Sequence, residues 1–234
     1  MNKTFLSPLF ILAALLISTL TSCSDENGSE ALPADTIFDM VTYTAQNSNG
    51  AVFSLIRNQD SPEVTLVAAG QHVNNSLFPV GCRMIIAYKM LSNNTSDGGN
   101  ITLYGGASVI NGKAEAKTAE ETDNFDSKSI RLTSVWLTGN YLNFEMLIDC
   151  TTTPQSVELA IDEATIGTDN PMIYLIVKAD DTGSSYWKQF YASFNLDDFL
   201  ATGADRFSVT IKDNQTFDGN LVKTFLINNN KPLN

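Results

Sequence analysis

The chain has 234 residues, of which 43% are hydrophobic and 17% charged, and its formal net charge at pH 7 is −12. Nucleic acids and anionic lipid headgroups bind clustered Lys and Arg, so a chain with 26 acidic and 14 basic residues is not expected to bind either. At roughly 150 residues per domain, this length is enough for one large domain or two small ones.

The first 22 residues have the layout of an export signal. Lys3 supplies a positive charge, and the run from Phe5 to Leu20 is almost wholly apolar. A membrane-spanning helix needs about 20 predominantly apolar residues, whereas this run is shorter and acidic residues rather than a basic cluster follow it. We therefore expect residues 1–22 to be a cleaved signal peptide.

Leu20-Thr21-Ser22-Cys23 resembles the bacterial lipobox. The resemblance implies that Cys23 becomes the first mature residue and carries a diacylglycerol on its thiol and a third acyl chain, such as palmitate, on its amine. Several acyl chains hold a protein stably on a membrane. The alternative is a chance cysteine in a fully secreted protein.

Residues 23–35 then form a lipidated acidic tether, since Ser24 to Glu30 contains no apolar residue. The acids directly after Cys23 resemble the signal that sends lipoproteins of some Gram-negative anaerobes to the cell surface. We therefore expect a lipoprotein of the outer membrane, bound to it by the lipid and facing outward. The periplasmic face of that membrane is the alternative.

Alternating apolar residues and turn signals predict five strands between residues 36 and 117. Asn49-Gly50 is a hairpin signal after the first strand, and the paired Gly105 and Gly106 indicate a bend in the fifth. The predicted strands are Thr36–Gln46, Ala51–Arg57, Glu63–Ala69, Gly81–Leu91 and Asn100–Ile110. Five strands with these features favour a small closed barrel of the OB type.

The segment 111–127 is polar, helix-friendly and without an apolar stripe, which predicts a domain boundary and a linker at residues 118–127. About seven strands follow over residues 128–230, a number and spacing that favour an antiparallel β-sandwich. They are Ile130–Thr138, Tyr141–Ile148, Val157–Ile161, Met172–Ala179, Tyr186–Asn195, Phe207–Lys212 and Val222–Ile227. Only 196–200 reads as a short helical turn, so the predicted fold class is all-β with little helix.

No pattern in the sequence predicts catalysis. His72 is the single histidine, whereas Ser or Cys hydrolysis needs a base beside the nucleophile and zinc needs several His or Cys ligands. The acidic pairs, such as Asp180-Asp181 and Asp197-Asp198, fall in predicted turns and lack the spacing of a calcium loop. We therefore expect no enzyme, no catalytic residue, no metal and no cofactor besides the lipid on Cys23.

Two further cysteines, Cys82 and Cys150, are open to two interpretations. An oxidising compartment would allow them to pair, but one pair in a chain of this size is no disulfide framework. Because they fall in different predicted domains, two separate thiols are the favoured interpretation.

The predicted strand 186–195 carries aromatic rings on both faces. One face is expected to lie in the core, and the other offers a surface on which a sugar or a partner side chain stacks. We take Tyr186, Trp187 and Tyr191 as candidate ligand-facing residues. Core packing of these aromatics without any ligand is the alternative.

Two segments resemble the NigD-like lipoproteins. Phe78 to Leu91 is similar to that family's strand with a glycine, an arginine and a tyrosine, and Val135 to Phe144 is similar to its tryptophan-containing hairpin ending in Tyr-Leu-Asn. The segment 195–200 matches a late strand-to-turn step less closely. The chain departs from the family pattern in lacking a histidine often found in the strand at 186–191.

The resemblance implies an OB-type domain and a β-sandwich behind a lipid anchor, covering nearly all of residues 36–228. It carries no established activity. The expected role is therefore non-enzymatic binding or an accessory function in the cell envelope, with a glycan or an envelope protein as the ligand. The alternatives are an immunity lipoprotein directed against a bacteriocin, which the family name hints at, and a structural component of fimbrial adhesins.

Overall fold

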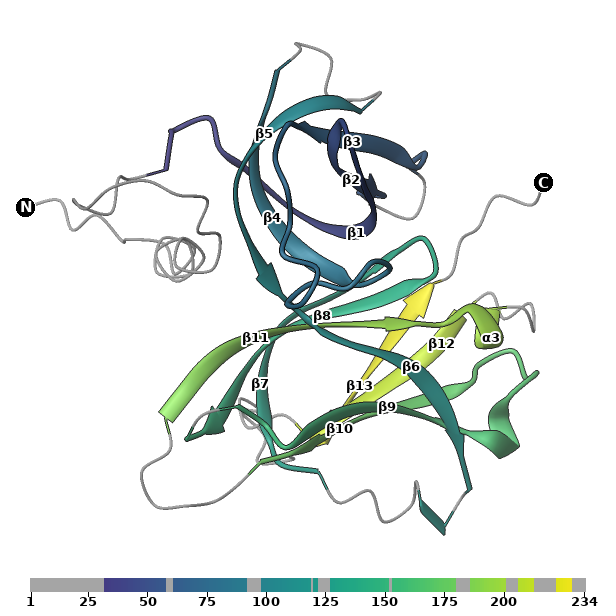
Figure 1. Ribbon diagram of the computed structural model, residues 1–234. Coiled ribbons are helices and arrows are strands. Elements are labelled where there is room, and N and C mark those ends of the chain that lie inside the picture. The colour runs from purple at the N-terminus through teal and green to yellow at the C-terminus, as the bar shows by residue number, and fades with distance from the viewer. Residues whose placement is uncertain are drawn as a thin grey trace, which may run out of the picture. The chain divides into compact units, whose positions relative to one another are not determined.

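A computed structural model describes residues 32–57, 61–91, 98–118, 120–121, 127–151, 153–179, 186–200, 206–212 and 222–228. The expected signal peptide, Cys23 and most of the tether lie outside these residues, so their predictions stay predictions. The chain divides after Ser108 into two compact units made almost wholly of strands (Figure 1). No helix in the described residues is long and apolar enough to cross a membrane.

The first unit is a closed barrel of five strands. They are β1 (Ile37–Asn47), β2 (Gly50–Leu55), β3 (Val64–Ala69), β4 (Arg83–Met90) and β5 (Gly99–Ser108). The order around the barrel is β1-β2-β3-β5-β4, and pairing of β1 with β4 closes it. Only β3 and β5 run parallel. The structure confirms the predicted five-stranded barrel.

Alternate residues of the barrel strands point inward and form one core. The rings of Tyr43 and Phe53, on neighbouring strands, have centroids 5.7 Å apart. The loop between β3 and β4 adds Val73 and Phe78 to this core. The side chain of Gln46 holds that loop, because its oxygen accepts a hydrogen bond from the Val73 N–H at 2.8 Å.

A polar group of three side chains is built into the barrel wall. The Tyr88 hydroxyl donates to Asp39 at 2.7 Å and accepts from Arg57 at 3.2 Å, and Arg57 also lies 3.6 Å from the Asp39 carboxylate. Burial, followed by the hydrogen bond to Asp39, raises the pKa of Tyr88. The buried phenol is thus fully hydrogen-bonded, and this group stabilises the barrel rather than marking a reactive site.

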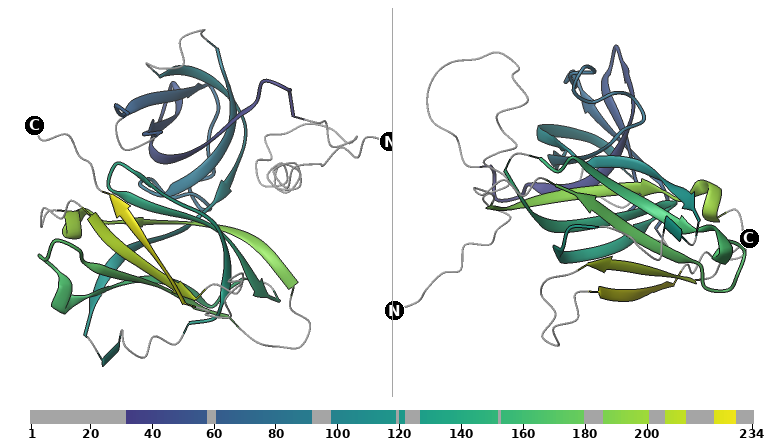
Figure 2. Two further views of the ribbon diagram at one scale, coloured as in Figure 1. Left: turned by 180° about the vertical axis from the view of Figure 1, so that it is seen from behind. Right: turned by 90° about the horizontal axis from the view of Figure 1, so that it is seen from below.

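The second unit is one eight-stranded sheet folded into two layers (Figure 2). Its order is β13-β12-β10-β9-β6-β11-β8-β7. The strands are β6 (Ile110–Lys117), β7 (Ile130–Thr138), β8 (Tyr141–Cys150), β9 (Ser156–Asp162), β10 (Met172–Lys178), β11 (Tyr186–Asn195), β12 (Arg206–Lys212) and β13 (Val222–Asn228). Two short helices, η2 (Glu163–Thr165) and α3 (Asp197–Leu200), complete it.

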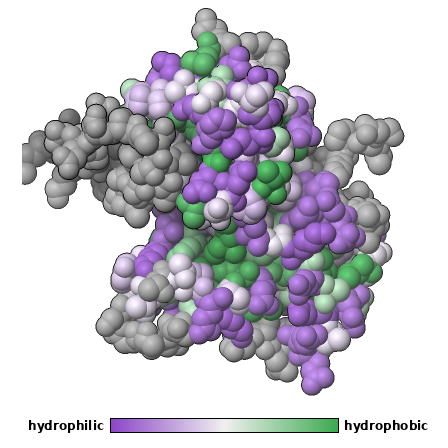
Figure 3. All heavy atoms as spheres, viewed as in Figure 1, coloured by the Kyte–Doolittle hydropathy of each residue, from purple (hydrophilic) through white to green (hydrophobic). Residues whose placement is uncertain are grey.

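Strand β6 belongs to both layers. Its first half pairs in parallel with β11 and its second half in parallel with β9, so it passes from one layer to the other (Figure 1). The core lies between the layers and includes an edge-on contact between Phe144 and Phe194. In the view of Figure 3, hydrophobic residues show in the middle of this unit with hydrophilic residues around them.

The structure differs from the sequence interpretation at residues 111–117, which form β6 rather than a polar, helix-friendly boundary. The division between the units falls after Ser108, not after residue 117. The residues that β6 turns inward, Ile110, Gly112 and Ala114, are mostly small, while the intervening Lys113 and Glu115 are exposed. Such a strand has almost no apolar alternation to detect. The predicted linker 118–127 lies mostly outside the described residues.

Two glycines of the barrel provide a matched test of its close packing. Gly50 and Gly70 both have positive φ angles, of 128° and 70°, so alanine strains the backbone at either position by roughly 1 kcal/mol. A Cβ on Gly50 would also lie 2.0 Å from the carbonyl oxygen of Ala68, whereas a Cβ on Gly70 meets nothing within 4 Å. Gly50→Ala should therefore destabilise the barrel by about 1–3 kcal/mol more than Gly70→Ala. Hydrogen exchange of peptides from β2 and β3 measures the difference, and equal losses of protection would contradict it.

Candidate functional site

One face of the sheet formed by β7, β8 and β11 points away from the sandwich core. On β11, Phe190, Ala192 and Phe194 pack in the core, so the alternate residues of that strand point outward. Cross-strand pairs extend the outward set, since Leu147 lies opposite Gln189 and Arg131, and Glu145 opposite Tyr191. We call this surface the outer face. It includes Arg131, Trp136, Glu145, Leu147, Asp149, Trp187, Gln189 and Tyr191, and it holds both tryptophans of the chain.

Trp187 is half-buried beneath a cation. The guanidinium carbon of Arg131 lies 4.1 Å from the centroid of the indole ring. A cation in this position is attracted by the ring electrons with about 0.5–2 kcal/mol, depending on its exposure to water. The contact joins β7 to β11 across β8 and fixes the position of the guanidinium over the sheet.

Tyr191, Gln189 and Glu145 form a hydrogen-bonded group beside this pair. The Gln189 amide nitrogen donates to Glu145 at 2.5 Å and to the Tyr191 hydroxyl at 2.9 Å. Burial, followed by the charge of Glu145 and a hydrogen bond to it, raises the pKa of Tyr191. The phenol therefore stays protonated at neutral pH and, together with the carboxylate, offers a fixed donor and acceptor on the outer face.

The other end of the same sheet face is filled by polar residues bonded to one another. Asn143 is buried, donates to the Thr138 hydroxyl at 2.9 Å and accepts from the Ser193 hydroxyl at 2.8 Å. Because these groups are both buried and satisfied, the part of the face suited to a ligand is the end that carries Arg131 and Trp187.

Of the three candidate aromatics, the structure brings Trp187 and Tyr191 together on the outer face. Tyr186 is the first residue of β11, is 59% exposed and lies on the opposite side of the strand from Trp187. The Lys188 ammonium, which is not part of the outer face, lies 4.5 Å from the centroid of its ring. Sequence reasoning missed Arg131, Glu145 and Gln189, because only the pairing of distant strands sets them beside the aromatics.

The remaining candidate residues do not form a reactive site. Cys82 is half-buried in the first unit and Cys150 is buried in the second, they are not joined in a disulfide, and burial raises the pKa of each thiol. His72 is exposed on the loop after β3. Within the described ranges, no three His, Cys, Asp or Glu side chains lie close enough to hold a metal ion.

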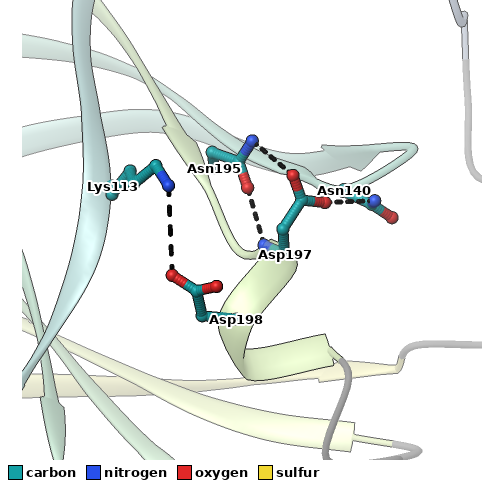
Figure 4. Close-up of polar contacts among 5 residues, drawn as sticks. All are labelled: Lys113, Asn140, Asn195, Asp197 and Asp198. Atoms are coloured by element: carbon teal, nitrogen blue, oxygen red, sulfur yellow. Dashed lines mark hydrogen bonds and ion pairs between the residues drawn. The ribbon is translucent and has the colours of Figure 1, made fainter.

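A second polar cluster joins the turn between β7 and β8 to the end of β11 (Figure 4). Asp197 accepts hydrogen bonds from the side-chain amides of Asn140 and Asn195, the latter at 2.8 Å, and its own N–H donates to Asn195 at 2.6 Å. The Leu196 N–H also donates to the Asn140 carbonyl at 2.8 Å. These residues come from two of the segments that carried the family resemblance. Their contacts give them a structural role at this corner.

The two acids of this corner are predicted to differ in their effect on stability. Asp197→Ala removes hydrogen bonds from two amides and should lower the free energy of unfolding by about 1 kcal/mol. Asp198 is 89% exposed and lies 4.0 Å from Lys113, so Asp198→Ala should cost less than about 0.5 kcal/mol. Urea unfolding followed by tryptophan fluorescence reports this unit, since both tryptophans lie in it. A larger loss for Asp198→Ala would refute the assignment.

A closed β-barrel followed by a two-layered β-sandwich defines the structural class of this protein. A model of the NigD-like C-terminal beta sandwich domain matches residues 113–226. This part of the chain belongs to that domain family, and the resemblance to NigD-like proteins is confirmed. Comparison with curated proteins gave no match.

Solved structures with the same fold include three from species of Bacteroides. A protein of unknown function from Bacteroides vulgatus has a TM-score of 0.63 at 16% identity, covering 85% of this chain and 92% of that one. A NigD-like immunity protein from Bacteroides caccae has a TM-score of 0.55 at 16% identity, with coverage of 82% and 92%. A candidate lipoprotein from Bacteroides fragilis has a TM-score of 0.56 at 10% identity, with coverage of 85% and 100%. At these identities the likeness shows a shared fold alone.

Proposed function

We propose that this protein is a lipid-anchored component of the cell envelope that binds a glycan on its outer face without catalysing a reaction. The observation that carries the proposal is the gathering of Trp187, Tyr191 and Arg131 on one outward sheet surface. Trp, Tyr and Arg are the residues most enriched at the centre of binding surfaces. Core packing does not require these side chains, because the alternate residues of the same strands fill the core.

The lipid anchor rests on the sequence around Cys23 and on the chain that follows it. From Cys23 to Ile37, where β1 begins, there are 14 residues, which span up to about 50 Å when fully extended. A segment of this length allows both units to stay in water while the lipid stays in the membrane. The Bacteroides fragilis protein with the same fold is described as a candidate lipoprotein, which is in line with this proposal.

Bacteriocin immunity remains a second hypothesis. It is supported by the name of the Bacteroides caccae protein, whose likeness to this chain is one of fold. The geometry of the outer face favours glycan binding over immunity, because rigid aromatic rings beside fixed hydroxyl and amide groups suit the apolar and polar faces of a sugar.

The anchor is tested by labelling cells with a palmitate analogue. The wild-type chain should carry the label and sediment with membranes, while Cys23→Ser should lose the label completely and leave the membrane fraction. Cys82→Ser is the matched control, since it removes a partly accessible thiol at a different position and should leave labelling unchanged. Retention of the label by Cys23→Ser would overturn the anchor.

Binding is tested with the purified mature chain on a glycan array. Trp187→Ala should weaken binding of any retained glycan about tenfold or more, because it removes a half-buried ring from the end of the face that is suited to a ligand. Ile166→Ala, which shortens an exposed apolar side chain beside η2, should bind as the wild type does. Failure of the wild type to retain any glycan, or full binding by Trp187→Ala, would contradict the proposal.

A further inference from the structure

Arg131 is a cation without an ion pair in the described part of the chain. Several other basic side chains are paired with acids, as Arg57 is with Asp39, Lys89 with Asp35 and Lys113 with Asp198. Arg131 instead lies over the indole of Trp187, although acidic residues outnumber basic ones by 26 to 14. The guanidinium of Arg131 is thus positioned by an aromatic ring and not by a carboxylate of the described residues.

A guanidinium that lies over a ring has lost much of its rotational freedom before any ligand arrives. Its N–H groups form a rigid fork that matches the two oxygens of a carboxylate, and the two parallel hydrogen bonds are stronger than those between neutral groups. Because the Trp187 contact holds the guanidinium in place, a carboxylate meets it with a small cost in side-chain entropy. We propose that Arg131 and Trp187 form a carboxylate-binding site, and that the glycan of the proposed function is a uronate-containing one.

The residues beside Arg131 point to a saccharide rather than an acidic peptide. Leu147 lies opposite Arg131, and Glu145, two residues along β8, is fixed by Gln189. A fixed carboxylate accepts hydrogen bonds from sugar hydroxyls but repels a ligand with a negative charge on every unit. Glu145, Gln189 and Tyr191 thus supply contacts for hydroxyl groups next to the site for a single carboxylate.

The charges around Arg131 and Trp187 restrict the class of ligand further. Asp149 lies opposite Trp187, so two carboxylates, Asp149 and Glu145, share the face with one guanidinium. Lys188 is on the other side of β11, where it donates to the Thr151 carbonyl. Densely sulfated polymers would meet more repulsion than attraction here. A glycan in which a uronate alternates with a neutral sugar presents its carboxylates singly, and this is the ligand class that the face fits.

The inference rests on the proposed function and is tested separately from it. The probes are hyaluronan oligosaccharides, which alternate a uronate with a neutral N-acetyl sugar, and the same oligosaccharides with their carboxyl groups reduced to alcohols. Calorimetry or tryptophan fluorescence with the mature chain measures both affinities. The wild type should bind the acidic form at least tenfold more tightly than the reduced form.

Three variants assign that preference to the guanidinium. Arg131→Gln should bind the two forms equally, and Arg131→Lys, which keeps the charge but loses the fork, should keep only part of the preference. Arg206→Gln is the matched control, because Arg206 is an exposed arginine at the start of β12, outside the outer face, and its loss should leave both affinities unchanged.

Equal binding of the two forms by the wild type, or an undiminished preference in Arg131→Gln, would overturn the carboxylate site while glycan binding stands. Binding of neutral glycans alone on the array would do the same. Absence of all glycan binding would instead refute the proposed function itself. Binding of poly-glutamate that depends on Arg131, without binding of the oligosaccharides, would assign the site to an acidic peptide and overturn the saccharide proposal.

Discussion

The close approach of Gly112 to the ring of Phe194 is the contact on which the sandwich depends. A Cβ at residue 112 would lie 2.9 Å from two atoms of that ring, so any larger residue would force the ring or β6 to shift from the position in which β6 pairs with β11. The requirement is one of space, since Gly112 is not among the residues with positive φ. With β6 in place, its second half pairs with β9, and the hydrogen-bonded order continues from one layer into the other. The eight strands therefore form a single sheet around one core.

The same contact fixes the surface proposed to bind the ligand. Strand β11 is paired with β8 along its whole length and with β6 at its second half, so its register is determined from both sides. A slip of β11 by one residue would turn Phe190 and Phe194 from the core to the outer face and would turn Trp187 and Tyr191 into the core. Such a slip would remove a large apolar area from the core. The packing of the core thus sets the positions of the outer-face side chains. Sites carried by central strands hold their geometry better than sites carried by loops.

Most strands were predictable because their inward residues are large and apolar, as in the run Met172 to Lys178. Strand β6 was missed because its inward residues are mostly small and its outward ones charged. Trp187 and Tyr191 were found from their own strand, but Tyr186 was grouped with them although alternation places it on the other side. Arg131 could not have been joined to Trp187 from the sequence, because the contact spans three strands and the β-bulge between Leu132 and Ser134 shifts the pairing of β7.

The acidity of the chain and a site for an acidic ligand are physically compatible. At physiological ionic strength the Debye length is about 8 Å, so charges far from the outer face act only weakly on a bound group. Recognition is then decided by the nearest charges, and Arg131 is positioned by an indole rather than neutralised by an acid. Exposed pairs such as Lys113 with Asp198 hold their cations in weak contacts of little consequence for binding. In the proposed site, the carboxylates of Asp149 and Glu145 would repel polyanions of high charge density, whereas the single guanidinium would accept a ligand whose negative charges are widely spaced.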